Sequence, residues 1–276
     1  MKTFNERLDA AAVKTGSLVC VGLDPDPARM PVKDVAEFNR AIIDATSEFA
    51  CAYKPQMAFY EALGIDGFKA LEQTVQHIRD AAPNAVIIGD AKRCDVGSTA
   101  AAYAHAMFEV WGFDAVTLVA YLGADGVEPF LQYPGRGVFI VCRSSNPSAR
   151  DLQDLHVTSG GTSMLLYQRV AQAAERWGGN DNVGLVVGAT YPKELRILRS
   201  THPGLPFLVP GVGAQGGDVA TAARAGTDEN GRGMVINSSR GILYASASPT
   251  GFAKAAAQAA GQLRDEINDA LQAVVG

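Results

Sequence analysis

Eight apolar runs, each about as long as one strand, recur along this 276-residue chain, and most of them are followed by a helical pattern. We predict strands at 18–23, 52–56, 85–92, 115–121, 138–144, 183–189, 207–211 and 234–238. We expect a short leading helix at 3–14 and further helices at 35–49, 66–82, 96–111, 162–177, 192–200, 218–225 and 251–274. The fourth connection, around 127–131, is short and weakly patterned. Eight strand-then-helix units within about 250 residues predict an α/β fold of the (β/α)8 class, the TIM barrel.

An open, doubly wound sheet is the alternative α/β arrangement. It would place a Gly-rich dinucleotide turn near its first strand and an acidic residue about 20 residues further on. The segment 21–25 reads Val-Gly-Leu-Asp-Pro, which is not such a turn. No linker, repeat of fixed period or low-complexity segment divides the chain. We therefore expect a single barrel domain over residues 1–276.

Composition limits the partners of the protein. A formal net charge of -5 lacks the basic surface that nucleic acid or an anionic membrane would attract. The first seven residues carry no apolar core or cleavage pattern, and the apolar runs are too short to span a bilayer. Cys20, Cys51, Cys94 and Cys142 are scattered, without the close pairs of a zinc or redox site. These features predict a cytoplasmic protein without a metal site, and three of the thiols, which lie in apolar runs, are expected to be buried.

Polar residues gather where the predicted strands end. In a TIM barrel the carboxyl ends of the strands carry the active site, whereas the opposite ends contribute to stability. The expected site residues are therefore Asp24, Lys54, Gln56, Asp90, Lys92, the segment 143–146, Gln215 and Arg240.

The segment from Asp90 to Thr99 carries the densest charge of this set. Asp90 and Lys92 end a predicted buried strand, and residues two apart on a strand project to the same side. Asp95 and Thr99 are four apart, on one face of the first turn of the next helix. Burying such charges is costly unless they compensate one another, which favours a role in chemistry. The alternative is a surface ion pair with Asp95 as a helix N-cap.

A lysine held between carboxylates stays protonated, because nearby negative charge favours its charged form. Such an ammonium can stabilise a developing carbanion and then protonate it. A Schiff-base nucleophile would instead need a lowered pKa. We therefore favour Lys92 as an acid, with Asp90 and Asp95 as its neighbours. Lys54, at the end of the second strand, could lie beside Asp90; the alternative is a solvated lysine.

The loops after strands seven and eight carry a phosphate-site pattern. Residues 210–218 read Pro-Gly-Val-Gly-Ala-Gln-Gly-Gly-Asp, and Arg240 follows the last strand. These two loops form the usual phosphate site of the barrel class, and glycines let backbone N–H groups approach an anion. Arg240 offers a planar fork for two phosphate oxygens. The glycines by themselves would indicate only tight turns. After strand five, Ser145 and Asn146 can read the edge of a planar amide-like ring or simply form a turn.

Taken together, these residues resemble the orotidine 5′-phosphate decarboxylase family. The hallmark is Asp90-x-Lys92-x-x-Asp95-x-x-x-Thr99, and it is joined by Asp24, Lys54, the segment 210–217 and Arg240. The Lys-Pro-Gln at 54–56 and the Ser-Asn-Pro at 145–147 resemble the longer bacterial branch of the family. The likeness extends from about residue 17 to 245. Gly97 and Ser98 depart from it, since many relatives have proline and an acidic residue there.

The resemblance implies decarboxylation of orotidine 5′-monophosphate to UMP in pyrimidine synthesis by a homodimer without metal or cofactor. It implies two sites at the dimer interface, with Lys54, Asp90 and Lys92 from one subunit and with Asp95 and Thr99 from the other. Asp24 and Lys54 would hold the ribose, Thr99 and Asp95 would lie near its 2′-hydroxyl, and Ser145 would read the pyrimidine. The phosphate would be held by Gln215, Gly216 and Arg240.

Two rival functions remain open. A related barrel acts on sugar phosphates with Mg²⁺ and shares the Asp-x-Lys-x-x-Asp run, but it would want an acidic metal ligand where this chain has Lys54. The second rival is a nucleotide-binding barrel without catalytic activity. The set of four charged residues (Lys54, Asp90, Lys92 and Asp95) argues against it.

Overall fold

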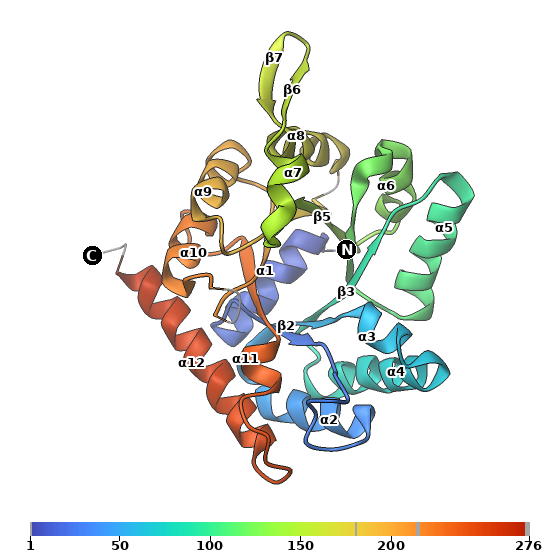
Figure 1. The fold of residues 1–276 in the computed structure, drawn as a ribbon, viewed down its shortest axis with the longest axis vertical. Coiled ribbons are helices and arrows are strands. Elements are labelled where there is room, and N and C mark those ends of the chain that lie inside the picture. The colour runs from blue at the N-terminus through green and yellow to red at the C-terminus, as the bar shows by residue number, and fades with distance from the viewer. Residues whose placement is uncertain (1, 180, 214–215, 274–276) are drawn as a thin grey trace.

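Eight parallel strands close into a barrel in the computed structural model, which describes residues 2–179, 181–213 and 216–273 (Figure 1). The order around the barrel is β1-β10-β9-β8-β5-β4-β3-β2. The barrel strands are β1 Val19–Leu23, β2 Ala50–Pro55, β3 Val86–Arg93, β4 Ala115–Leu118, β5 Gly137–Arg143, β8 Val183–Val187, β9 Phe207–Pro210 and β10 Met234–Ser238. The predicted single-domain (β/α)8 barrel is therefore confirmed, and all eight predicted strands are present.

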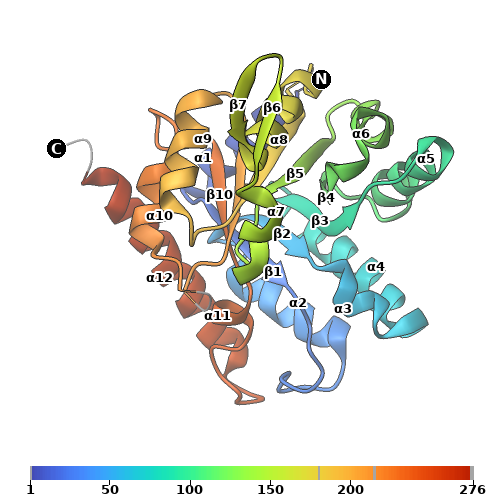
Figure 2. The same ribbon diagram turned by 45° about the horizontal axis from the view of Figure 1, so that its top comes forward.

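Helices surround this barrel (Figures 1 and 2). The α-helices are α1 Phe4–Thr15, α2 Val35–Thr46, α3 Met57–Glu61, α4 Gly64–Ala81, α5 Gly97–His105, α6 Ala124–Leu131, α7 Arg150–Gln153, α8 Leu166–Trp177, α9 Pro192–Thr201, α10 Val219–Gly226, α11 Arg240–Leu243 and α12 Phe252–Gln272. Helical turns of other types are η1 Ala106–Val110, η2 Ala120–Leu122 and η3 Pro147–Ala149. Among the residues that the structure describes, no helix is both long enough and apolar enough to cross a membrane.

The barrel strands are buried on both faces, which explains why they read as continuous apolar runs. All five residues of β1 and all five of β8 are buried. Parallel strands covered by helices outside and packed side chains inside have no solvent-facing side, so no alternation of polar residues is needed. Cys20, Cys51 and Cys142 are buried as expected, and Cys94 is partly exposed.

Helix α1 covers the amino-terminal end of the barrel. Its N-cap Thr3 forms a capping box with Glu6, which satisfies two free N–H groups of the first turn. Phe4 is fully buried and meets Phe139 of β5 edge to face, with ring centroids 5.7 Å apart. Arg7 of the same helix pairs with the buried Asp114 at 2.5 Å. This end of the barrel is closed by packing and ion pairs.

Several predicted boundaries were wrong, among them that of the helix at 35–49, which ends at Thr46. The fourth strand ends at Leu118 rather than 121, and η2 follows it. The predicted helix 162–177 begins only at Leu166, because Thr162–Leu165 forms strand β7. Strand β7 pairs in antiparallel fashion with β6, His156–Ser159, and this hairpin projects from the body of the barrel (Figures 1 and 2). The expected helix 96–111 comprises α5 and the π-helical turn η1.

Candidate active site

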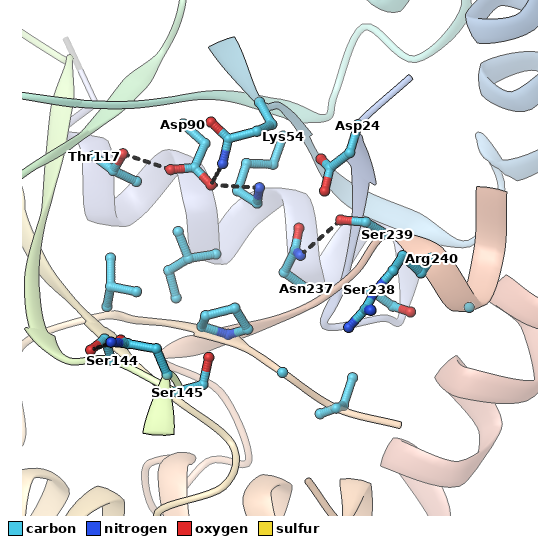
Figure 3. A pocket seen from close by; sticks show the side chains of 18 of the residues that line it. Asp24, Lys54, Asp90, Thr117, Ser144, Ser145, Asn237, Ser238, Ser239 and Arg240 are labelled. Carbon is cyan, nitrogen blue, oxygen red and sulfur yellow. Dashed lines mark hydrogen bonds and ion pairs between the residues drawn. The ribbon is translucent and has the colours of Figure 1, made fainter. Parts of the chain in front are cut away.

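A cavity of about 690 Å³ opens at the carboxyl ends of the barrel strands. Its lining joins residues from all eight barrel strands or the loops directly after them, and it includes Asp24, Lys54, Asp90, Lys92, Ser145 and Arg240. Figure 3 shows three groups around it: Lys54 and Asp90 on one side, Ser144 and Ser145 opposite them, and Ser238, Ser239 and Arg240 at a third side. The sequence expectation that the polar strand ends meet is confirmed for these residues.

Asp90 is the centre of the charged group. Its Oδ2 accepts hydrogen bonds from Lys54 Nζ at 2.8 Å and from Gln56 Nε2 at 2.9 Å. Its Oδ1 accepts from Lys92 Nζ at 2.6 Å and from Thr117 Oγ1 at 2.9 Å. Four donors therefore fix the orientation of one carboxylate, and two of them are cations.

The charges within this group compensate one another. Burial alone would raise the pKa of Asp90, but Lys54 and Lys92 bring it below its ordinary value. Burial alone would lower the pKa of Lys54, which is only 3% exposed, but the charges of Asp90 and Asp24 and the hydrogen bond to Asp90 raise it. Both groups are consequently ionised at neutral pH, as a buried pair with mutual hydrogen bonds should be.

Lys92 differs from Lys54 in its setting. Its side chain is 49% exposed, and its ammonium faces the cavity rather than the core. The backbone of Lys92 has a left-handed φ of +48°, and its N–H donates to Thr117 Oγ1 at 3.0 Å. The pairing of β3 with β4 shifts register between Gly89 and Arg93, so Lys92 lies in an irregular strand end. The expected adjacency of Asp90 and Lys92 is present, although the backbone between them is not a regular strand.

Asp24 follows β1 and also lines the cavity. Its Oδ1 is buried and has no hydrogen-bond partner among the described residues. The backbone of the same residue is held by Tyr244, whose hydroxyl donates to the carbonyl of Asp24 at 2.8 Å and accepts from the N–H of Asp26 at 2.7 Å. An acceptor fixed in this way is suited to a ligand hydroxyl, since a buried polar atom without a partner is costly.

The end of β10 brings Asn237, Ser238, Ser239 and Arg240 to the cavity. A Cβ atom on Gly22 of β1 would lie 1.9 Å from the hydroxyl oxygen of Ser239, so only glycine permits this approach of the two strands. Arg240 is exposed at the first residue of α11. Gly216 is exposed with φ +86°, and Gln215 lies outside the described residues.

Several expected site residues lie elsewhere. Asp95 and Thr99 are not among the described residues that line the cavity. The alternative in which Asp95 is the N-cap of this helix is wrong, because the N-cap is Val96 and the Asp95 carboxylate accepts from the N–H of Val96 at 2.7 Å. Arg143 also departs from the expected strand-end site, because it is fully buried and pairs with Asp154 at 2.9 Å.

Three residues that the sequence did not single out also line the cavity, namely Thr117, Asn237 and Tyr244. Thr117 is the one polar residue of β4, and Asn237 follows three apolar residues of β10; both are buried. A buried polar residue inside an apolar run requires a partner, and this signal could have marked both positions. Tyr244 follows the last strand by several residues, and nothing local to it indicates contact with residues 24–26.

The fold and the site define a (β/α)8 barrel enzyme with a cluster of charged side chains at the carboxyl ends of its strands. The sequence profile of the "Orotidine 5'-phosphate decarboxylase / HUMPS family" matches residues 17–256. The chain therefore belongs to this family.

Individual relatives agree with the family assignment. The orotidine 5'-phosphate decarboxylase of Dehalococcoides mccartyi strain 195 is 49% identical over 266 residues, which cover 96% of this chain and 97% of the relative. That of Paracidovorax citrulli is 48% identical over 275 residues, covering 97% and 99%. The solved structure of Leishmania donovani OMP decarboxylase has a TM-score of 0.84 at 38% identity and covers 98% of each chain. The resemblance inferred from the residues is thus confirmed, as is the prediction of a carboxy-lyase of this type.

Proposed function

We propose that the protein converts orotidine 5′-monophosphate to UMP and CO2 in de novo pyrimidine biosynthesis, with Lys92 as the general acid. The observation that carries the proposal is the contact of Lys92 Nζ with Asp90 Oδ1 at 2.6 Å inside the cavity. The family and its decarboxylase relatives support the substrate and the reaction. A cytoplasmic location follows from the biosynthetic role and forms part of the proposal.

The proposed reaction breaks the bond between C6 of the pyrimidine and its carboxylate. Carbon dioxide leaves, and the electron pair of the bond stays on C6. The ammonium of Lys92 stabilises this charge and then transfers a proton to C6, which gives UMP and leaves a neutral amine that regains its proton from solvent. At about 4 Å and an effective dielectric near 20, one such charge pair contributes roughly 4 kcal/mol, or about a thousandfold in rate. Preorganised contacts and remote binding energy supply the remainder.

The arrangement of the cluster suits this task. Asp90 is already ionised and held by four donors, so it fixes the orientation of the Lys92 ammonium before substrate arrives. Preorganisation of this kind avoids reorientation during the reaction. The substrate carboxylate would enter beside Asp90, and the partly exposed Lys92 would face the carbon that loses it.

The residues that line the cavity indicate the remaining contacts of the substrate. Asp24, with its unpaired Oδ1, and Lys54 would bind ribose hydroxyls. Ser145 lies across the cavity from Asp90 and would read the pyrimidine edge (Figure 3). The phosphate would bind Arg240 at the third side, together with Gln215 and Gly216. This assignment places the three parts of the nucleotide at the three groups of residues around the cavity.

A homodimer with shared sites is part of the proposal. Asp95 and Thr99 are not among the described lining residues, so they could reach a substrate only from a second copy. Large apolar side chains are exposed close to them in the sequence and along the next connection, namely Val96 (60%), Val119 (41%), Tyr121 (88%) and Leu122 (50%). Covering such side chains is what an interface between copies would achieve.

The proposed chemistry needs no cofactor, because Lys92 supplies both the positive charge and the proton. The Mg²⁺-dependent rival would need an acidic ligand near the end of β2, where Lys54 occupies the position with a buried ammonium. The test is the loss of orotidine 5′-monophosphate absorbance with purified protein, before and after treatment with EDTA. We expect the same turnover in both samples. No turnover in either would overturn the proposed reaction, and turnover lost to EDTA and restored by Mg²⁺ would overturn the proposal that the reaction needs no metal.

A further inference from the structure

Residues 144–147, here called the base-side loop, follow β5 and all line the cavity. The loop carries Ser145, which recognises the pyrimidine in the proposed function. A short loop that must present a hydroxyl to a planar ring needs a fixed backbone, because a displacement of about 1 Å costs much of the binding and rate. The contacts that hold this loop in place therefore matter for recognition of the base.

Gln153 binds the base-side loop from a position outside the cavity. Its Oε1 accepts from the backbone N–H of Ser144 at 3.0 Å, and its Nε2 donates to Ser144 Oγ at 2.9 Å. Ser144 Oγ in turn donates to Asn146 Oδ1 at 2.5 Å. One amide side chain thus binds both the main chain and the side chain of the residue before Ser145. Gln153 is not among the described residues that line the cavity, so it acts on a substrate only through the loop.

Arg143 holds both Gln153 and the neighbouring Asp154 in place. Its side chain is fully buried, its guanidinium lies 3.9 Å from the ring centroid of Tyr191, and it pairs with Asp154 at 2.9 Å. Arg143 Nη1 also lies 3.4 Å from Oε1 of Gln153. The arginine at the end of β5 therefore fixes the end of α7, and this explains why it points away from the cavity.

The opposite side of the base-side loop packs against Gly188, which directly follows β8. The N–H of Gly188 donates to the carbonyl of Arg143 at 2.7 Å. A Cβ atom at Gly188 would lie 2.9 Å from the Cα, Cβ and backbone N atoms of Ser145. Ser145 is consequently packed against backbone on one side, while Gln153 holds the preceding residue on the other.

We infer that Gln153 is a positioning residue that sets the specificity of this site for the pyrimidine base by clamping Ser144 and thereby orienting Ser145. The inference rests on the proposed function, since it takes the base to be read by Ser145. A substitution of Gln153 should therefore change the affinity of ligands that carry a base and leave unchanged the affinity of ligands that carry only ribose and phosphate.

The experiment compares the affinities of UMP and ribose 5-phosphate by calorimetry for the wild-type protein, Gln153→Ala and Gln153→Glu. Gln153→Ala removes both contacts with Ser144, and we expect about a tenfold weaker affinity for UMP, the loss that one or two net hydrogen bonds account for. Gln153→Glu keeps the acceptor for the Ser144 N–H and loses the donor to Ser144 Oγ, so its loss should be smaller. Ribose 5-phosphate should bind all three proteins within about twofold, a difference that is small on the scale of one hydrogen bond.

Asp151→Ala is the matched control, because Asp151 is an exposed residue of the same short helix. Thermal unfolding of each variant reports whether it is folded. UMP affinity unchanged in Gln153→Ala would overturn the inference, and so would equal losses for UMP and ribose 5-phosphate. If the wild-type protein nevertheless decarboxylates orotidine 5′-monophosphate, the proposed function stands without this inference. If Gln153→Ala does not fold, a difference between the two ligands in Gln153→Glu decides the question.

Discussion

Lys92 places its ammonium nitrogen 2.6 Å from Oδ1 of Asp90 while its own backbone has a left-handed φ of +48°. Left-handed backbone costs a residue with a Cβ atom roughly 1–2 kcal/mol. The N–H of Lys92 donates to Thr117 Oγ1, which also donates to Asp90 Oδ1, so the same threonine supports both the unusual backbone and the ion pair. Strained conformations of this kind concentrate at functional sites.

This strain yields a stability prediction. Lys92→Gly and Lys92→Ala both remove the ammonium, so they disturb Asp90 equally, but only glycine adopts φ +48° without a steric cost. We expect Lys92→Gly to have a free energy of unfolding about 1 kcal/mol higher than Lys92→Ala. Denaturant unfolding of the two variants measures the difference. A less stable glycine variant would show that the backbone at this position is not strained.

Asp114 gives a prediction on pH. It is 1% exposed and pairs with Arg7, Arg79 and Arg136 at the amino-terminal end of the barrel. Burial alone would raise its pKa, but the hydrogen bonds and charges of Arg79 and Arg7 hold the pKa below the ordinary value. A lowered folded-state pKa contributes stability that is present above the unfolded pKa, near 3.9, and lost as the pH falls through the folded value.

Asp114→Asn should therefore lower the free energy of unfolding by about 3 kcal/mol at pH 7, because it removes the buried carboxylate that pairs with three half-buried arginines. The difference from the wild-type protein should shrink as the pH falls below about 4. Denaturant unfolding at several pH values checks this, with Asp80→Asn on the exposed side of α4 as control. A difference that is constant from pH 7 to 3 would contradict the assigned ionisation.

The fold was predictable where burial is uniform. Barrel strands lie between helices and a packed interior, so each one reads as an unbroken apolar run whatever its position in the barrel. The hairpin β6–β7 was missed because its residues resemble a helix start. Gly160 and Gly161 form its turn and both have positive φ, as a two-residue type I′ loop requires. A Gly-Gly pair between two alternating segments was the available signal.

The site was predictable only in part. Asp90, Lys92 and Lys54 end strands, and strand order in a barrel makes such ends neighbours. Thr117 could not be placed, because its contact with Asp90 depends on how β3 and β4 align across an irregular strand end. The turn of Arg143 away from the cavity depends on Tyr191 and Asp154, which are distant from its own strand.

A mixture of two inactive variants tests the shared sites. Lys92→Ala and Asp95→Ala should each be inactive alone as homodimers. In a mixed dimer, one of the two sites would combine the intact Lys92 and the intact Asp95, so random mixing should restore about a quarter of the wild-type sites. Steady-state turnover after mixing and re-association measures this. No recovery, with dimers shown by their mass, would place both residues in one subunit's site.

We expect Arg240 to bind the phosphate of the nucleotide. Arg240→Ala should weaken UMP about 10- to 100-fold, the range expected for a charge-assisted hydrogen bond, while uridine binds as before. Competitive inhibition constants for the two ligands measure the effect. Equal losses for both would count against contact between Arg240 and phosphate.

Turnover of orotidine 5′-monophosphate by Lys92→Ala shows whether the ammonium of Lys92 stabilises and protonates C6. We expect a fall in kcat of at least about a thousandfold, with UMP binding still measurable and with the exposed Lys69→Ala unaffected. Turnover by Lys92→Ala close to that of the wild-type protein would contradict this role.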